Sequence, residues 1–406
     1  MTTLLHSARP TRSLHTHHAF AHLPEASLAQ GRHSVWVLFD EVGFPLKAGL
    51  DETYTSAIDP VTVDEWTDGS GLMMVPPFTD IHCHGGGGHA YEDADGMRQL
   101  LETHRRHGTG RTVASLVANP IEQLEASCRR IARAIESGRD IPEGIRLEGI
   151  HAEGPWISPA HKGAHNADYL HQASIDEARR LVEASDGYLR QVTLAPEMDP
   201  GLAVTRYLAD QGVRVAVGHT DADYPTSRAA FDAGASILTH AFNAMNGIHH
   251  RQPGPVVAAM ESPHVYLEVI ADGVHVAPEV IAMLFRAAPG RVVLITDAMS
   301  ATGQPDGDYR LGSLGVRVDA GVARLVTDDG SQGAIAGSTL TLDQAVRTAV
   351  AAGVSPDEAL EAATSRPAQA LGLATWGEGL PLQLVDEEFS PVRDLTPRTS
   401  SRRLRP

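Results

Sequence analysis

Short runs of apolar and β-branched residues recur along most of the chain, and each run is followed by a longer segment with helical spacing. Segments such as IEQLEASCRRIARAIESG place apolar residues every three to four positions. Eight such units predict an α/β fold, a (β/α)8 barrel of the TIM type, in which catalytic side chains gather at the carboxyl ends of the strands. The predicted strands are residues 74–84, 112–119, 145–155, 191–197, 214–220, 235–243, about 266–273 and 292–298.

The two ends of the chain lack this alternation. Residues 1–75 are irregular and β-rich, and residues 371–395 contain one strand-like run, LPLQLVDEEF. We therefore predict one small β domain built from both chain ends, beside a catalytic barrel over residues 76–370 and before a basic, disordered tail at 396–406. After the eighth strand, period-two alternation around the DAG sequence at 319–321 predicts a hairpin, which leads into the last helix.

Composition narrows the partners that this chain could have. It has 42% hydrophobic residues but no apolar run of the roughly 20 residues needed to span a bilayer, and no secretory leader, so we expect a cytoplasmic protein without a membrane partner. The formal net charge of -18 argues against nucleic acid, because phosphate binding needs clustered cations. Two cysteines, Cys83 and Cys128, cannot make a disulfide framework and suit a reducing compartment.

The 21 histidines are more than a chain of this length usually carries, and position distinguishes two groups among them. One group, together with two carboxylates, closes the predicted strands, which randomly scattered surface histidines would not do. These residues are His82 and His84 (first strand), Glu153 (third), His219 (fifth), His240 (sixth), His275 (seventh) and Asp297 (eighth). The group without an expected role in chemistry is His15, His17, His18, His22, His89, His104 and His107.

The stretch FTDIHCHGGGGHA, residues 78–90, admits two interpretations. On a strand, His82 and His84 would share one face and bind a single metal, with Cys83 on the opposite face. The four glycines could instead cradle a phosphate, and structural core histidines are a further alternative. A phosphate cradle would also need a lysine and a helix start, which this stretch lacks. We therefore interpret the glycines as a close-packed turn beside a metal site.

Glu153, His219 and His240 together offer two nitrogen ligands and one oxygen ligand, with room for water, which is typical of a catalytic zinc site. Taken singly, each could be a surface or structural residue. Asp297 is suited to act as the general base beside a metal-activated water, although an aspartate that caps a helix is the alternative. Asn243, Arg251 and His275 suit an anionic ligand, with surface placement of Arg251 as the competing interpretation.

Eight motifs in chain order carry a family resemblance: TDIHCHGGGG, HAEGPWISPAHKGAH, VGHT, THAFNAM, RQPG, ADGVH, TDA and AGSTLTLDQAV. Over residues 74–372 they resemble the N-acetylglucosamine-6-phosphate deacetylases of the amidohydrolase superfamily, a group of metal-dependent barrels. Each motif is weak alone, but their ordered succession at strand ends is specific. The GxLxxGxxAD signature that closes many amidohydrolases is degraded here to WGEGLPLQLVDEEF, a departure that touches none of the candidate site residues.

The resemblance implies hydrolysis of N-acetyl-D-glucosamine 6-phosphate to D-glucosamine 6-phosphate and acetate, in a homodimer. It assigns the main metal to Glu153, His219 and His240, and a second metal position to His82 and His84. One or two divalent ions are implied per subunit, with zinc expected and iron, manganese or cobalt as alternatives. Asp297 becomes the catalytic acid and base, and His165 stabilises the oxyanion. The implied substrate contacts are Ala164, His165, Asn243, Ala244, Arg251, Asp272, His275, Ile335, Ala336 and Gly337, with Arg251 and His275 as phosphate holders.

Three other functions are compatible with parts of the sequence. A deacetylase for N-acetylgalactosamine 6-phosphate is the main alternative, because one epimeric hydroxyl is not legible in a sequence. A dihydroorotase or hydantoinase would carry a bridging lysine near the end of the fourth strand, where this chain has LAPE. A catalytically inactive barrel that binds sugar phosphates would not need Asp297.

Overall fold

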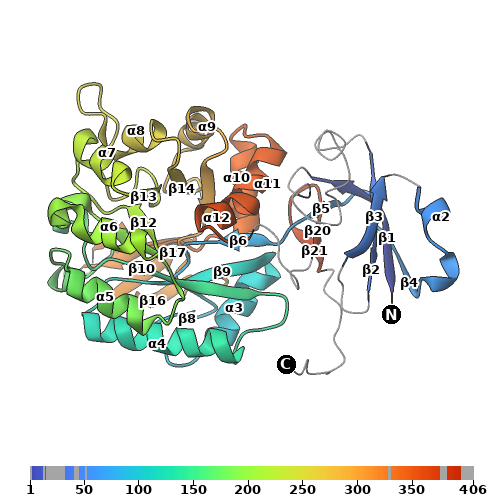
Figure 1. Ribbon diagram of the computed structural model, residues 1–406, viewed down its shortest axis with the longest axis horizontal. Helices are drawn as coiled ribbons and strands as arrows, with labels where there is room; N and C mark the ends of the chain where they lie inside the picture. The colour runs from blue at the N-terminus through green and yellow to red at the C-terminus, as the bar shows by residue number, and fades with distance from the viewer. Residues whose placement is uncertain are drawn as a thin grey trace.

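The structure, a computed structural model, describes residues 2–11, 14, 33–40, 45–50, 53–327, 331–374 and 382–394. Its larger part is a parallel barrel with helices around it, and a smaller β sheet lies beside the barrel (Figure 1). The predicted tail at 396–406 and His15, His17, His18 and His22 lie outside the described residues.

The barrel sheet contains all eight predicted strands, paired in parallel in the order β15-β14-β13-β12-β11-β10-β9-β6. Most strands end before the predicted limits, so the polar residues that follow them lie on loops at the mouth of the barrel. The (β/α)8 prediction is confirmed. The strands are β6 Phe78–Asp80, β9 Thr109–Leu116, β10 Arg146–Glu153, β11 Leu189–Leu194, β12 Arg214–Val217, β13 Ala235–Leu238, β14 Tyr266–Ile270 and β15 Val292–Ile295.

The first predicted strand, 74–84, is wrong as a single element. Residues Met73–Val75 form β5 of the small sheet, and β6 begins only at Phe78. Pro76 and Pro77 stand between them, and proline has no N–H to continue a ladder. His82 and His84 therefore follow the barrel strand instead of lying on it.

The barrel closes at the last residue of β6 and just beyond the end of β15. The Thr296 hydroxyl donates to Asp80 Oδ2 at 2.6 Å, and the Asp297 amide donates to the His82 carbonyl at 2.8 Å. Cys83 bridges Ala298 in parallel at the same seam. Closure thus holds the segment that contains His82 and His84 against the segment that contains Asp297.

Amphipathic helices cover the barrel on the outside (Figure 1). The helix α4, for example, buries Ile121, Leu124, Cys128 and Ile131, which recur at helical spacing. The helices of the barrel region are α3 Met97–Arg106, α4 Ile121–Ser137, α5 Ile175–Ala184, α6 Ala203–Asp210, α7 Tyr224–Asp232, α8 Gly254–Met260, α9 Pro278–Ala287, α10 Leu342–Ala351, α11 Pro356–Ala363 and α12 Ser365–Ala370.

The small sheet joins both ends of the chain, as the fold prediction required. Its path is β21-β20-β5-β1-β2-β3, with β4 paired to β1. A separate apolar core, which includes Leu5, Val37, Met74 and Leu384, holds this sheet together. The strands are β1 Thr3–Pro10, β2 Val35–Phe39, β3 Pro45–Leu50, β4 Glu65–Asp68, β20 Gln383–Val385 and β21 Pro391–Asp394, and the short helix α2 Tyr54–Ala57 lies outside them.

The predicted hairpin is part of an antiparallel sheet of four strands, β16-β17-β18-β19. The turn at Ala320–Gly321 joins β17 and β18, and both residues have positive φ, as a tight hairpin turn needs. These strands are β16 Gly307–Leu311, β17 Leu314–Asp319, β18 Val322–Val326 and β19 Gln332–Ile335. The sheet places Leu311 and Ile335 over the barrel mouth, where both line the cavity described below.

Candidate metal centre

The polar residues that close the strands converge at one point of the barrel mouth. Glu153 ends β10, while His219, His240 and Asp297 each lie two residues beyond β12, β13 and β15. Those three have φ values of 47°, 23° and 49°, in the left-handed region that non-glycine residues rarely adopt. Such conformations persist where the surrounding structure holds them, and they concentrate at functional sites.

Glu153 lies at the centre of the cluster. Its Oε1 is 3.1 Å from Nε2 of both His219 and His240. Its Oε2 is 3.0 Å from His84 Nε2, and His82 Nε2 lies 3.3 Å from Oε1. Asp297 completes the group, because its Oδ1 is 3.4 Å from His84 Nε2 and 3.6 Å from His82 Nε2.

Hydrogen bonds decide which nitrogen of these rings is free to bind a metal. His84 Nδ1 donates to the Ser115 carbonyl at 3.1 Å, and His219 Nδ1 donates to the His161 carbonyl at 2.9 Å. A carbonyl can only accept, so each Nδ1 carries the ring proton. Each Nε2 therefore turns a lone pair toward Glu153, as a metal ligand must.

His82 turns its Nε2 inward in the same way, because its Nδ1 faces Glu268 Oε2 at 3.1 Å. The Nε2 atoms of His82 and His84 are 3.2 Å apart. Two lone pairs this close repel each other unless a cation lies beside both. The donor set of imidazole nitrogens and carboxylate oxygens therefore fits a divalent metal ion.

The electrostatics of the cluster also favour positive charge. Burial acts to lower the pKa of His82, but Glu153 and Asp297 raise it well above its usual range. Burial acts to raise the pKa of Glu153, whereas His82 and His219 lower it well below its usual range. The buried carboxylates thus favour a positive charge beside the Nε2 atoms, which either a proton or a metal ion can supply.

His165 belongs to the cluster but differs from the metal-facing rings. It lies 3.3 Å from Glu153 Oε2, close enough for Glu153, His165 and His219 to form a possible ligand set. However, the Ala118 amide donates to His165 Nδ1 at 3.1 Å, so the ring proton is on Nε2. Burial also lowers the pKa of His165 to about 4, so the ring is neutral at pH 7. We therefore interpret His165 as a hydrogen-bond donor and not as a metal ligand.

A cavity of about 370 Å³ opens onto the cluster, and most of the predicted substrate contacts line it. They are Ala164, His165, Asn243, Ala244, His275, Ile335 and Gly337. Ala336 is fully buried beside this wall, and Asp272 and Arg251 are not among the lining residues. Arg251 is exposed, on the loop between β13 and α8, where its Nη1 lies 2.7 Å from His250 Nε2.

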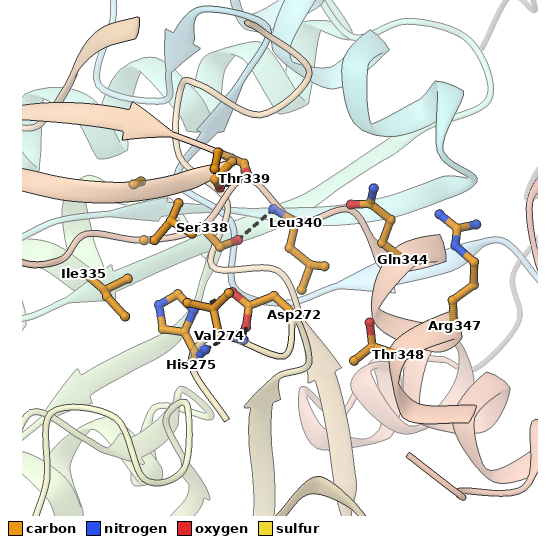
Figure 2. A pocket seen from close by; sticks show the side chains of 15 residues that line it. Asp272, Val274, His275, Ile335, Ser338, Thr339, Leu340, Gln344, Arg347 and Thr348 are labelled. Atoms are coloured by element: carbon orange, nitrogen blue, oxygen red, sulfur yellow. Dashed lines mark hydrogen bonds and ion pairs between the residues drawn. The ribbon is translucent and has the colours of Figure 1, made fainter. Parts of the chain in front are cut away.

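A second cavity, of about 350 Å³, shares His275, Ile335 and Gly337 with the first. Figure 2 shows that α10 contributes Gln344, Arg347 and Thr348 to its wall, opposite Asp272 and His275. Asp272 Oδ2 is 2.6 Å from His275 Nδ1. Asp272 therefore orients the ring of His275 from the side of the second cavity.

Three buried residues near the metal cluster were not identified from the sequence: His151, Glu268 and His104. Beneath the cluster, buried His151 links Ser115 Oγ at 3.0 Å to Thr193 Oγ1 at 2.8 Å. Glu268 is fully buried on β14 and touches His82. The sequence did carry one indication of it, since Glu268 is the only charged residue within the apolar run VYLEVI. His104, expected to have no role, donates through Nε2 to the Gly85 carbonyl at 2.9 Å and so supports the glycine turn.

The family to which these motifs point is established by comparison with known proteins. The sequence model of the amidohydrolase family matches residues 73–378. The chain belongs to the amidohydrolase family. Members of this family are metal-dependent, in agreement with the two overlapping groups of metal-capable side chains around Glu153.

Similar members of the amidohydrolase family are sugar-phosphate deacetylases, which confirms the resemblance. N-acetylgalactosamine-6-phosphate deacetylase from Escherichia coli O157:H7 is 40% identical over 78% of this chain and 83% of that protein. N-acetylglucosamine-6-phosphate deacetylase from Vibrio furnissii is 37% identical over 74% of both. A variant of the Mycobacterium smegmatis N-acetyl-D-glucosamine-6-phosphate deacetylase, solved in complex with N-acetyl-D-glucosamine-6-phosphate, is 38% identical over 89% of this chain and 93% of that chain, with a TM-score of 0.80.

The helices in the part of the chain that the structure describes were compared with the requirements for crossing a membrane. No helix there combines the length and the apolar character that a bilayer span requires.

Proposed function

We propose that this amidohydrolase removes the acetyl group of N-acetyl-D-glucosamine 6-phosphate, giving D-glucosamine 6-phosphate and acetate. The observation that carries the proposal is the convergence of Glu153, His219, His240 and Asp297 beside one cavity. The similarity to deacetylases from Vibrio furnissii and Mycobacterium smegmatis supports the substrate class.

Glu153, His219 and His240 would hold the main metal ion, and His82 with His84 would hold a second one. Zinc is the expected ion, since imidazole and carboxylate ligands with room for water suit it. When bound there, a divalent ion lowers the pKa of water to about 7 and polarises a carbonyl group. The remaining chemistry falls to side chains of this chain.

Asp297 is placed to move the protons of the reaction. Its carboxylate borders the cavity and is within 3.4 Å of His84, so it faces the space where the attacking water must lie. We assign to Asp297 the removal of one proton from that water as it attacks the acetamide carbon. The same carboxyl group then returns the proton to the amine nitrogen as the C–N bond breaks.

His165 is suited to the oxygen of the acetamide. Its proton is on Nε2, which points toward Glu153 and the cavity, and its low pKa keeps the ring neutral near pH 7. A neutral N–H donor in a buried site stabilises the negative charge that develops on the carbonyl oxygen. This assignment agrees with the fixed tautomer of the ring.

The remaining predicted contacts would hold the sugar and its phosphate. His275 lies in the cavity wall, oriented by Asp272, and would contact the phosphate from within the subunit. Arg251 is exposed on its loop and does not line the cavity of its own chain. We propose that Arg251 serves the phosphate site across the interface of a homodimer. A cytoplasmic location stays a prediction.

Deacetylation of N-acetyl-D-galactosamine 6-phosphate is the second candidate. It is favoured by one observation, the 40% identity to a deacetylase of that specificity. The two sugars differ at one hydroxyl, and both carry the acetamide and phosphate that the site would hold.

Acetate release from each epimeric sugar phosphate, measured with and without a chelator, tests the proposal. We expect higher kcat/KM for the gluco epimer and loss of activity on chelation, with recovery when zinc is restored. Preference for the galacto epimer would transfer the assignment to the second candidate. No acetate from either sugar with metal-loaded protein would refute both.

A further inference from the structure

Glu268 is a buried carboxylate that the reaction described above does not use. It lies on β14 with no exposed surface, between Leu267 and Val269, which belong to the barrel core. Burying an ionised carboxylate is costly unless hydrogen bonds or a cation compensate for the lost water. The partners of Glu268 therefore indicate why this charge is kept inside the barrel.

Three groups from three different strands or strand ends contact Glu268. Its Oε2 lies 3.1 Å from His82 Nδ1 and 3.3 Å from the backbone amide of His240. Its Oε1 accepts from Gln191 Nε2 at 2.8 Å. One carboxylate thus touches a residue of each predicted ion position, His82 of the second and His240 of the main one.

We propose that Glu268 is a positioning residue that makes the His82–His84 pair an ion site by fixing the proton of His82 on Nδ1. The proposal rests on the proposed function only in taking this pair as a metal position. It adds Glu268 and its contact with His82 to the deacetylation mechanism, and it gives a reason why His82 binds an ion.

The two rings of the pair have different supports. His84 Nδ1 donates to the neutral carbonyl of Ser115, whereas His82 Nδ1 faces the carboxylate of Glu268. A carboxylate behind an imidazole fixes the tautomer and makes the outer nitrogen a stronger ligand. His82 is thus the ring whose donor strength depends on a charged side chain, and a bound cation offsets the charge of Glu268.

A purely structural role is the competing explanation, because Glu268 also ties β14 to Gln191 on β11. The two explanations differ in what they predict for metal binding. A strand tie would affect folding and both ion positions alike. A positioning role would weaken the second position and leave the ion at Glu153, His219 and His240 in place.

The deciding measurement is the number of ions bound per subunit, and their dissociation constants, in full-length Glu268→Gln protein titrated with Co²⁺. We expect wild type to bind two ions, and the variant to bind the second one about 10- to 100-fold more weakly with the first unchanged. The matched control is Glu148→Gln. It removes a carboxylate of β10 that is paired with Arg111 of β9 at 2.7 Å, and it should change neither of the two Co²⁺ dissociation constants. Glu268→Asp, which keeps the charge at a shorter reach, gives an intermediate loss and replaces Glu268→Gln should the latter not fold.

A double variant shows whether Glu268 acts through His82. In a His82→Asn background, Glu268→Gln should cause no further loss of Co²⁺ binding. Equal second-ion affinity in wild type and Glu268→Gln, or wild type that binds only one ion, would overturn the proposal. Neither result touches the proposed deacetylation at the main ion, which fails separately if metal-loaded wild type releases no acetate from either sugar; wild type with one ion would remove only the second ion position from the proposed function.

Discussion

Two cavities of nearly equal volume, about 370 and 350 Å³, share one wall in this protein. His275, Ile335 and Gly337 face both of them. The first cavity ends on Glu153 and the histidines around it, whereas the second is lined by loops, the β17–β18 turn and α10 (Figure 2). Cavity volume therefore does not identify the site, and the chemistry of the walls does.

The walls differ because their charged groups are balanced in different ways. In the second cavity, Arg347 is paired with Asp343 at 2.9 Å and Asp272 with His275 at 2.6 Å. In the first, Glu153 faces imidazoles, and its charge acts to raise the pKa of His82 and of His84. Charged groups that no fixed ion pair neutralises are the ones suited to bind metal ions and move protons. Four measurements test this difference between the two cavities.

Replacing the proton carrier of the first cavity should have the largest effect. We expect Asp297→Asn to lower kcat about 10⁴-fold, at the upper end for general acid–base catalysis, because an amide cannot accept the proton of the water. Steady-state acetate release and metal content measure this together. Full activity in Asp297→Asn with normal metal content would refute the assignment.

Removing the neutral hydrogen-bond donor His165 should lower kcat less than replacing Asp297. His165→Asn eliminates the Nε2–H aimed at the cavity, and we expect kcat to fall roughly 10²- to 10³-fold with little change in metal affinity. Because burial lowers the pKa of His165 to about 4, its titration should not appear in the pH–rate profile between pH 5 and 8. Loss of a metal ion from the variant would show that the ring is a ligand instead.

A buried histidine that faces neither cavity should act on stability and not on turnover. Burial lowers the pKa of His104 to about 4, against about 6.5 in the unfolded chain. The neutral ring of the folded state therefore contributes fully above pH 6.5, and the free energy of unfolding should fall by roughly 3 kcal/mol between pH 6.5 and 4. Urea unfolding at several pH values gives the free energy of unfolding as a function of pH. Its slope should be smaller in His104→Leu by the equivalent of about one proton. An unchanged slope would contradict the assigned pKa.

The smallest effect is expected in the second cavity. Gln344 is exposed on α10, so Gln344→Ala should leave kcat and KM within about twofold of wild type and stability within roughly 0.5 kcal/mol. The same kinetic assay measures it beside Asp297→Asn. A change of tenfold or more in either constant would make the second cavity part of the functional site and remove the contrast.

The barrel could be predicted because its signals are local. Each parallel strand is buried on both faces, so it appears as a short apolar run, and each ligand follows its run directly. Glu153, His219, His240 and Asp297 were identified in this way, and the structure brings them together. The first strand was misjudged because Met73–Val75 leads through Pro76 and Pro77 to the apolar Phe78, so the two strands resemble one run although they belong to different sheets.

Other features have no local signal. The support of His82 by Glu268 joins residues 186 positions apart, and the Thr296 hydroxyl that helps close the barrel reaches Asp80 over 216 positions. The tautomer of His165 depends on the amide of Ala118, which no residue type at position 165 could reveal. The second cavity arises where α10 meets two distant loops, and the sequence contains no pattern for it.

The barrel, the order of its strands and the residue types at their ends follow from the amino-acid sequence alone, because burial and periodicity act between near neighbours along the chain. The folded arrangement sets which histidine nitrogens face inward, which carboxylate supports His82, and on which wall His275 lies. Those properties depend on hydrogen bonds between segments that meet only when the barrel closes, since a proton on an imidazole is placed by whichever distant acceptor or donor the fold brings to it.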